Sequence, residues 1–383
     1  MSWDIVKLGD IATFVNGYPF KPTDWSNSGK EIIRIQNLTK SSGESNFFEG
    51  TIPEKYKVTK GDVLISWSAT LDIFKWDGDD AWLNQHIFKV VFDKREIDKR
   101  FFNFLIQHVL DDLKKQVHGA TMKHITKGKF DNTPVPLPPL STQKRIAEIL
   151  DTADALRRKD QELLRKYDEL AQAIFIDMFG DPVRNEKGWE VKKLGDICTK
   201  ITDGTHDTPE RLTSGVKFIT GKHIRPYTID YKNSDYVTEE IHKEIYRRCN
   251  PEIGDILYTN IGVNYATAAM NTVEYEFSMK NVALLKYNRK IITGRFLEYL
   301  LNNEFFKDKL KKLTGIGGAQ QFLSLAQIKD INILVPSKSL QNKFDIIIDG
   351  LTPATNNLNI ANNKSEFLFL SLLQKAFKGE LIS

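Results

Sequence analysis

The sequence predicts two α/β (α+β) domains that are copies of one another, joined by two long antiparallel coiled-coil helices. Three observations support this prediction: an internal repeat, a long stretch with a heptad pattern, and a second such stretch near the C-terminal end. A length of 383 residues also exceeds what one ordinary hydrophobic core serves. We therefore divide the chain into a first domain (1–139), a central helix (140–180), a second domain (181–337) and a distal helix (338–383).

The central helix is predicted from residues 141–179, which contain neither glycine nor proline and repeat apolar residues at heptad spacing. At 1.5 Å per residue it would span about 57 Å, which suits a spacer better than a core element. The alternative is a helix that faces the core of one globular domain. Asp160 is the polar residue on the stripe and would set the register of the helix pair. The predicted seam residues of this helix are Ile146, Ile149, Ala153, Leu156, Leu163, Tyr167, Leu170 and Ile174.

The internal repeat begins at Trp3 and at Trp189. The segments WDIVKLGDIAT and WEVKKLGDICT agree at seven of eleven positions, so gene duplication is the best explanation. The strand-like runs KGDVLIS and IGDILYT also correspond. So do two amphipathic helices, which begin at Arg100 and Arg295 and are each followed by a polar loop that contains glycine.

Both copies end in an apolar, proline-bearing segment that leads into a long helix, and Gln143 aligns with Gln341. Two helices with complementary stripes at these positions pack most economically antiparallel, which relates the copies by an internal pseudo-two-fold axis. Pro353 lies inside the distal helix, where a proline removes a backbone hydrogen bond and costs about 3 kcal/mol. We expect a kink or a break there. The predicted seam residues of the distal helix are Phe344, Ile347, Leu351 and Leu358.

The composition indicates which partners and which cellular compartment to expect. A net charge of +4 permits a polyanionic partner without requiring one. Cys198 and Cys249 belong to no CxxC or Cys/His cluster, which indicates a reducing compartment and no structural zinc. The N-terminus has no signal pattern, and no apolar run approaches the ~18 residues of a membrane span. We expect a cytoplasmic protein.

No motif in the chain predicts catalysis. The nearest approach to a phosphate-binding Walker loop, GVKFITGKH, has five residues between its glycines and a histidine where Ser or Thr would hold magnesium. None of the seven histidines stands at metal-ligand spacing from a cysteine or another histidine, so we predict no metal site. His206, within DGTHDTP, is best interpreted as stabilising a turn, with a ligand or DNA contact as the alternative.

Several of these motifs together resemble the specificity subunit of type I restriction-modification enzymes. They are the two LGDI segments, DGTHDTP with the following FITGKHI, and the helix starts VPLPPLSTQKRIAEIL and LVPSKSLQNKF. The resemblance covers essentially the whole chain. It implies that each domain is a target recognition domain that reads one half of a bipartite, asymmetric site in double-stranded DNA, while the helices set the spacer between the half-sites.

The resemblance also implies partners. Two methyltransferase subunits, which carry S-adenosylmethionine, would dock along the helices, and restriction subunits that use ATP and Mg²⁺ would join them. The chain itself would be no enzyme and would bind no cofactor. Two other functions stay open: a structural scaffold that pairs two partner subunits without reading bases, and the DNA-reading subunit of another multi-chain restriction enzyme.

Recognition loops vary within such a family, so the candidate DNA contacts come from residue type and position, with a solvated loop residue as the alternative for each. In the first domain they are Lys21, Gln36, Asn37, Lys40, Ser66, Ser68, Lys75, Thr121, Lys123 and His124. In the second domain they are Thr205, His206, Lys222, His223, Tyr258, Asn260, Asn264, Tyr265, Gln320 and Gln321. The glycine-containing loops HGATMKHITK and GIGGAQQFLS are candidates for phosphate contacts through their backbone N–H groups.

Overall fold

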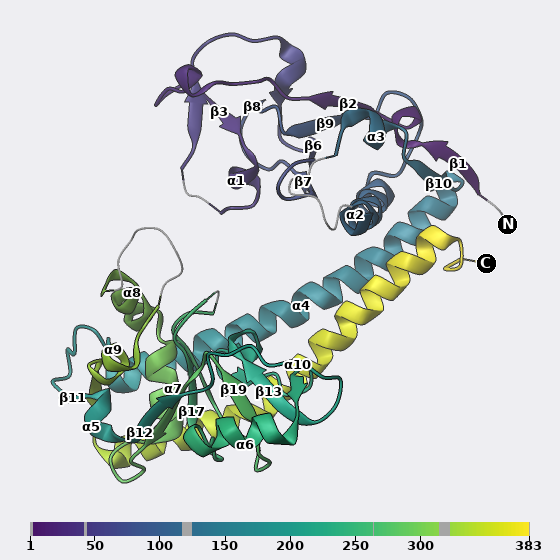
Figure 1. Ribbon diagram of the computed structural model, residues 1–383. Coiled ribbons are helices and arrows are strands. Elements are labelled where there is room, and N and C mark those ends of the chain that lie inside the picture. Colours follow the sequence, from purple (N-terminus) through teal and green to yellow (C-terminus); the bar gives the residue numbers. More distant parts are fainter. Residues whose placement is uncertain (1–2, 42–43, 117–124, 263, 314–321, 383) are drawn as a thin grey trace. The chain divides into compact units, whose positions relative to one another are not determined.

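The computed structural model describes residues 3–41, 44–116, 125–262, 264–313 and 322–382, in two compact units (Figure 1). Unit 1 consists of Met1–Gln161 and Ile360–Ser383, and unit 2 of Glu162–Asn359. Each unit contains one globular domain and parts of two long helices, α4 (Leu140–Phe179) and α10 (Lys338–Lys378). The units divide inside these helices, so the division of the chain at 139, 180 and 337 stays a sequence prediction.

The first domain contains two four-stranded sheets, with strand orders β2-β9-β6-β7 and β4-β3-β8-β5, and a two-stranded ladder of β1 and β10. Most of these pairs are antiparallel, but β3 and β8 run parallel. The strands are β1 (Asp4–Lys7), β2 (Thr13–Asn16), β3 (Lys30–Ile33), β4 (Asn46–Phe48), β5 (Lys57–Val58), β6 (Val63–Ser66), β7 (Asp72–Lys75), β8 (Ala81–Leu83), β9 (Ile87–Val91) and β10 (Pro134–Leu137). The helices are η1 (Leu8–Asp10), η2 (Pro22–Asp24), α1 (Ile35–Leu38), η3 (Glu54–Tyr56), α2 (Lys99–Gln116) and α3 (Lys127–Asp131).

The second domain repeats this plan, with a four-stranded sheet β12-β20-β17-β18, a three-stranded sheet β16-β13-β19 and a ladder of β11 and β21. The parallel pair is β13 and β19. The strands are β11 (Glu190–Lys193), β12 (Cys198–Asp203), β13 (Val216–Thr220), β14 (Ile224–Arg225), β15 (Thr228–Ile229), β16 (Asp235–Val237), β17 (Ile256–Thr259), β18 (Thr267–Met270), β19 (Ser278–Lys280), β20 (Ala283–Tyr287) and β21 (Asn332–Val335). The helices are α5 (Leu194–Ile197), η4 (Gly221–His223), α6 (Glu239–Arg248), α7 (Gly294–Asn302), α8 (Glu304–Leu313) and α9 (Leu325–Lys329).

The repeated LGDI segments occupy equivalent places in the two domains. Each follows the first strand of a ladder that closes the domain, and its leucine begins the next turn of helix. The backbone N–H of Leu8 donates to Thr133 O at 3.0 Å, and that of Leu194 donates to Ile331 O at 2.8 Å. The duplication predicted from the sequence is therefore present in the fold.

A buried glutamine joins each long helix to the domain that precedes it. The Asp98 N–H donates to Gln143 Oε1 at 2.9 Å, and Gln143 Nε2 donates to Pro138 O at 2.8 Å. Gln341 repeats the arrangement in unit 2, where the Thr293 N–H donates to its Oε1 at 2.8 Å. Because buried polar groups are costly unless they are hydrogen-bonded, these amides fix where each long helix starts relative to its domain.

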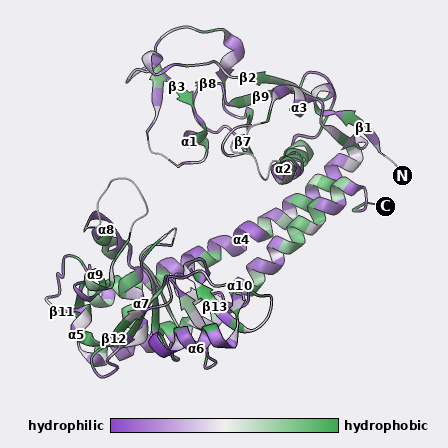
Figure 2. Cartoon of the chain, in the orientation of Figure 1, coloured by the Kyte–Doolittle hydropathy of each residue, from purple (hydrophilic) through white to green (hydrophobic). Residues whose placement is uncertain are grey.

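The two long helices pair antiparallel in both units, as predicted. In unit 1 the beginning of α4 shares a core with the end of α10, and Arg157 Nη1 donates to Glu366 Oε2 at 3.3 Å. In unit 2 the end of α4 packs against the beginning of α10, where the Phe179 and Phe344 rings lie 5.3 Å apart. Polar and apolar residues alternate along both helices (Figure 2).

The buried stripe of the helix pair differs from the predicted seam at Leu156, Leu170 and Ile347, which are 47%, 46% and 41% exposed. These three predictions were wrong. A strict heptad pattern drifts by about 20° per repeat on a straight α-helix, and packing against the globular domains selects a different stripe. Of the other predicted residues, Ile146, Ala153 and Phe344 are buried, and Ile149, Leu163, Tyr167, Ile174, Leu351 and Leu358 are half-buried. Asp160 is also buried.

Pro353 does not break α10, which runs from Lys338 to Lys378, so a break was the wrong expectation, whereas the alternative, a kink, stays a prediction. The proline is exposed, and it follows Thr352, whose hydroxyl donates to Ile348 O at 3.0 Å. Packing of the preceding turns into the core of unit 2 holds the helix across the missing hydrogen bond.

Replacing Pro353 with alanine should stabilise unit 2. Alanine restores the N–H that proline lacks and has the higher helix propensity, so we expect the free energy of unfolding to rise by about 1–3 kcal/mol. Urea denaturation of the full chain measures this change. The matched control is Asn357→Ala, another exposed position of the same helix, for which propensity predicts only a few tenths of a kcal/mol. Equal effects of the two substitutions would contradict the prediction.

Within the described ranges, none of the helices combines the length and the apolar character that crossing a membrane requires.

Candidate nucleic-acid interface

The parallel strands β13 and β19 of the second domain end side by side, with Thr220 opposite Lys280. Residues that follow the two strands therefore meet at one edge of the sheet, which we call the second-domain edge: Thr220, Gly221, Lys222, Lys280 and Asn281. The carboxyl ends of parallel strands are common positions for ligands because the loops there are free to vary.

The second-domain edge opens into a hollow of about 310 Å³. Its remaining walls are Arg211 and the loop between β17 and β18, through Ile261, Gly262 and Asn264. Asn264 Nδ2 donates to Gly221 O at 3.0 Å and to Ile224 O at 2.9 Å, which ties this loop to the edge. The hollow is thus built from four separate segments of the chain, around residues 211, 220–222, 261–264 and 280–281.

Positive charge predominates around the hollow. Asp235 Oδ2 lies 2.7 Å from Arg211 Nη1 and 3.0 Å from Lys222 Nζ. Burial alone would raise the pKa of Asp235, but the Lys222 ammonium and the Arg211 guanidinium hold it below its usual value. Lys280, the third cation, donates to the Thr208 hydroxyl. One carboxylate balances part of the charge of three cations, so the hollow suits an anionic or hydrogen-bond-accepting ligand.

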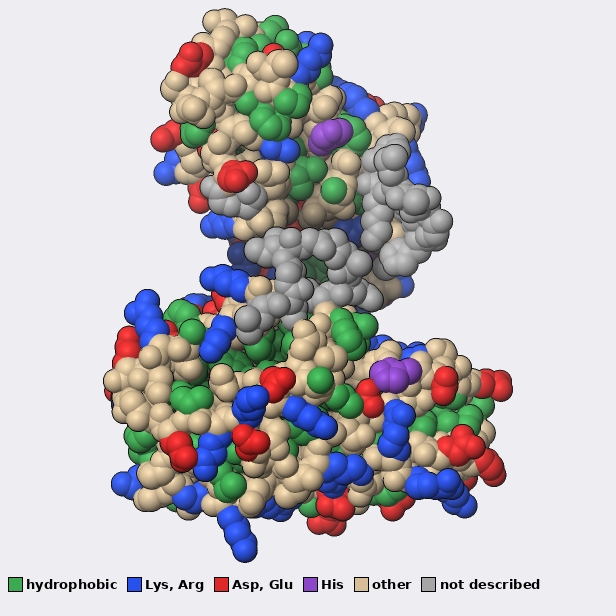
Figure 3. All heavy atoms as spheres, turned by 60° about the vertical axis from the view of Figure 1, so that its left-hand side comes forward, with side chains coloured by type: hydrophobic (Ala, Val, Ile, Leu, Met, Phe, Trp, Pro, Cys, Tyr) green, Lys and Arg blue, Asp and Glu red, His purple; other side chains and the backbone are tan. Residues whose placement is uncertain are grey.

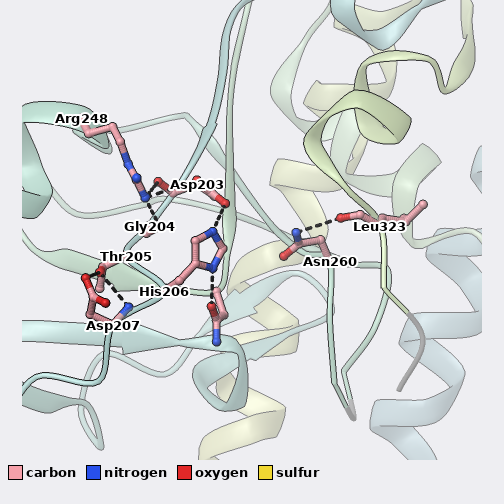
Figure 4. Close-up of polar contacts among 9 residues, drawn as sticks. Asp203, Gly204, Thr205, His206, Asp207, Arg248, Asn260 and Leu323 are labelled. Carbon is pink, nitrogen blue, oxygen red and sulfur yellow. Dashed lines mark hydrogen bonds and ion pairs between the residues drawn. The ribbon is translucent and has the colours of Figure 1, made fainter. Parts of the chain in front are cut away.

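The DGTHDTP segment forms a turn beside the same edge (Figure 4). His206 Nε2 lies 2.8 Å from Asp203 Oδ2, and its Nδ1 lies 3.0 Å from Asn281 Oδ1. The backbone N–H of Thr205 donates to Met279 O at 2.9 Å. A Cβ on Gly204 would lie 2.1 Å from that oxygen, so the turn requires glycine. These contacts agree with the interpretation of His206 as a turn-stabilising residue.

The first domain presents an equivalent edge after β3 and β8, where Ile33 pairs with Leu83. The Arg34 N–H donates to Asn37 Oδ1 at 2.9 Å, as the Thr220 N–H donates to His223 Nδ1 at 2.9 Å. We define the first-domain edge as Arg34, Gln36, Asn37, Asn84 and Gln85.

The turn beside each edge also corresponds in the two domains. Gly17 matches Gly204, since the N–H of the residue after each glycine donates to the same strand end: Tyr18 to Leu83 O at 2.8 Å and Thr205 to Met279 O at 2.9 Å. Tyr18 forms a parallel bridge to Asn84, as Thr205 does to Lys280. By this register Gln36 is equivalent to Lys222, and Asn84 to Lys280.

A hairpin stands beside each edge and is held by a buried hydroxyl. Thr259 Oγ1 donates to Asn264 O and accepts from the Thr267 N–H at 2.9 Å. Ser66 does the same in the first domain, where its hydroxyl donates to Thr70 O and accepts from the Asp72 N–H at 3.1 Å. The fold therefore repeats even where the two sequences share little.

The structure brings some of the predicted contacts together. Lys222 and Asn264 line the hollow, Thr205 and His206 form the adjacent turn, and Gln36 and Asn37 lie at the first-domain edge. Ser68 belongs to the loop of the neighbouring hairpin.

Three other predicted contacts are not among the residues that define the hollow and the two edges. Lys75 is at the opposite end of its hairpin, where it pairs with Val63, so it lies away from the loop. Lys21 and Lys40 are exposed and flank η2 and α1. These positions stay predictions.

Five predicted contacts are buried, and their burial corrects the prediction that they touch DNA directly. Tyr258 and Ser66 are fully buried, and Asn260 is 3% exposed, with Nδ2 donating to Leu323 O at 3.0 Å (Figure 4). His223 and Tyr265 are 3% and 8% exposed. A polar residue beside a strand end can point inward as easily as outward, and residue type alone does not distinguish the two.

Some predicted contacts lie outside the described residues: Thr121, Lys123, His124, Gln320 and Gln321, with most of the two glycine-containing loops. Sequence reasoning also missed contributors to the edges, namely Arg211, Thr220, Lys280 and Asn281, and in the first domain Arg34, Asn84 and Gln85. The short strands AWL and SMK, each followed by polar residues, were the signal for Asn84 and Lys280. Nothing local in the sequence marked Arg211.

Neither a metal cluster in the described ranges nor a large area of one charge on the face in Figure 3 marks another site. On the face shown in Figure 3, Lys and Arg side chains are interspersed with Asp and Glu. Among the described residues, no group of three or more His, Cys, Asp and Glu side chains could hold a metal ion.

Two copies of one α/β domain, with equivalent polar edges that differ in their side chains, are the architecture of a two-domain recognition protein. The chain matches the type I restriction modification DNA specificity domain over residues 1–165 and 186–360, and it belongs to this family. It is a DNA specificity subunit with two recognition domains, and its role in the restriction-modification system is specificity rather than catalysis.

Known relatives match almost the full length of the chain. It is 25% identical to the type I restriction enzyme EcoBI specificity subunit of Escherichia coli, over 99% of this chain and 86% of that one. It is 22% identical to the MjaIX specificity subunit of Methanocaldococcus jannaschii, over 99% and 92%. Its fold is similar to that of the S subunit of a type I restriction-modification system from M. genitalium, with a TM-score of 0.55, 16% identity and coverage of 98% and 96%.

Proposed function

We propose that each domain reads one half of a bipartite, asymmetric site in double-stranded DNA. The observation that carries this proposal is the pair of equivalent edges, which share a scaffold but differ in side chains: Gln36 and Asn84 in one domain, Lys222 and Lys280 in the other. Side chains of these types discriminate base edges in the major groove. Two similar readers with different side chains would read two different half-sites.

We further propose that α4 and α10 set the spacer between the half-sites and dock two methyltransferase subunits. Both helices expose large apolar side chains in their described parts, among them Leu156, Ile346, Ile360 and Phe367, the last of which is 75% exposed. Where such side chains form a continuous patch, they are available to pack against a partner protein. S-adenosylmethionine would be bound by the methyltransferases, and ATP and Mg²⁺ by restriction subunits. We also propose a cytoplasmic location, because DNA and these partners occur there.

Exchanging residues 1–139 for the first domain of a family member with another specificity should change one half-site only. The chain, reconstituted with its methyltransferase partner, would be tested by sequencing the DNA that the complex methylates. We expect the half-site of the second domain to stay unchanged, because its edge is built entirely from unit 2. The reciprocal exchange of residues 181–337 is the matched control and should change the other half-site.

Two outcomes would contradict the proposal. A change of both half-sites would show that the domains are not independent readers. Methylation without any sequence preference would instead favour a scaffold that pairs partner subunits without reading bases.

A further inference from the structure

The two edges differ in a systematic way at equivalent positions. Lys222 and Lys280 of the second domain correspond to Gln36 and Asn84 of the first, so two ammonium groups replace two amides on the same scaffold. An ammonium group only donates hydrogen bonds, whereas an amide donates and accepts. The two edges are therefore complementary to different hydrogen-bonding patterns.

We infer that the second-domain edge reads a guanine and the first-domain edge an adenine, an inference that rests on the proposed function. Guanine presents two acceptors in the major groove, O6 and N7, which suit lysine. Adenine presents the N7 acceptor beside the N6 donor, which suits the amide of Asn or Gln. Lys222 and Lys280 are thus specificity-determining residues for one half-site, and Gln36 and Asn84 for the other.

The surroundings of Lys222 favour a base edge over a phosphate. Its ammonium lies 3.0 Å from Asp235 Oδ2, and that carboxylate also binds Arg211. A neighbouring carboxylate reduces the attraction to a phosphate but fixes the direction of the remaining N–H groups. The Lys222 side chain is still 55% exposed, so those groups are accessible.

Hydrogen bonds also hold other polar groups of the two edges in place. Lys280 is held by the Thr208 hydroxyl and Asn281 by His206, so each keeps a defined position in the hollow. In the first domain Asn84 Oδ1 accepts from the Gln85 N–H at 2.8 Å, which fixes the plane of its amide. Fixed donors and acceptors on a rigid scaffold are what discrimination between bases requires.

The test exchanges the edge residues between the domains in the full chain with its methyltransferase partner. Binding is measured by selection from DNA with randomised half-sites. For Lys222→Gln with Lys280→Asn we expect the preference for guanine at one position of one half-site to fall about 10-fold or more, with adenine favoured instead. Gln36→Lys should shift one position of the other half-site from adenine to guanine. Lys243→Gln, at an exposed position of α6, is the matched control and should change neither half-site.

The possible results distinguish a failure of the proposed function from a failure of this inference. If the wild-type complex selects no sequence, the proposed function fails and this inference fails with it. If the wild type selects a bipartite sequence but the lysine substitutions weaken binding equally for all sequences and reduce the salt slope by about 1 for each lysine, the lysines contact phosphate and the inference is overturned. An unchanged base preference would overturn it as well. The variants should fold normally, because the substituted lysines are not part of a hydrophobic core. Circular dichroism of each variant checks this.

Discussion

Replacing Phe175 with alanine is expected to lower the free energy of unfolding of unit 2 by about 3–5 kcal/mol. The side chain is fully buried near the end of α4. Its ring centroid lies 5.1 Å from that of Phe179, 5.7 Å from that of Phe296 on α7 and 5.7 Å from that of Phe344 on α10. It thus joins three helices, and the cavity left by its removal could close only if all of them moved.

The two cysteines provide a measurement specific to unit 2. Both lie in this unit, and burial raises the pKa of the Cys198 and Cys249 thiols to about 12, so they react slowly while it is folded. Thiol labelling across a urea gradient therefore reports the unfolding of unit 2. We expect Phe175→Ala to move the labelling midpoint to much lower urea.

The control for this substitution is Ile346→Ala, on the part of α10 that also lies in unit 2. That isoleucine is 73% exposed, so its replacement should change the free energy of unfolding by less than about 0.5 kcal/mol. Similar effects of the two substitutions would show that the end of α4 is not part of the core of unit 2.

The second large effect is expected for Gln341→Glu, which replaces a fully buried amide. Gln341 Nε2 donates to Pro336 O at 2.8 Å and to Ile291 O at 3.2 Å. A carboxylate there would face two carbonyl oxygens without a proton to share, which costs about 3 kcal/mol or more. The start of α10 would then lose its attachment to the second domain.

This effect should depend on pH. Burial and the facing carbonyl oxygens would raise the pKa of the introduced carboxyl above the ~4.3 of an unfolded chain. Below that value the carboxyl is protonated in both states and can donate to Pro336 O, so the loss of stability is small. The loss grows as the pH rises from about 4.3 toward the raised pKa and is complete above it.

Urea denaturation at pH 4.5 and at pH 7.5, relative to the wild type, checks this dependence. Gln374→Glu, at an exposed position of the same helix, is the matched control and should behave alike at both pH values. A loss of the same size at both pH values would contradict the prediction, because it would show that the introduced carboxyl keeps the pKa that it has in the unfolded chain.

The sequence was sufficient for the domain plan because duplication leaves a local record. The aligned glutamines at 143 and 341 make the same hydrogen bonds, and the aligned LGDI segments start the same turns. Turns at glycine and proline, and the periodicity of helices and strands, depend on a few neighbouring residues. Both can therefore be predicted directly from the sequence.

The candidate site could be predicted only in part, because it depends on which way side chains point and which strands pair. Lys222 and Asn264 were identified by residue type, but Tyr258 and Ser66, of equally plausible type, are fully buried. Arg211 and Lys280 meet at the hollow although they lie 69 positions apart (280 − 211), because Leu212 bridges to Tyr236 on β16 and the strands β16, β13 and β19 form one sheet. The seam shows the same limit, since Leu156 fits the heptad pattern yet is 47% exposed. Local periodicity specifies that a helix forms, whereas long-range packing against the domains selects the face that it buries and the strand ends that come together.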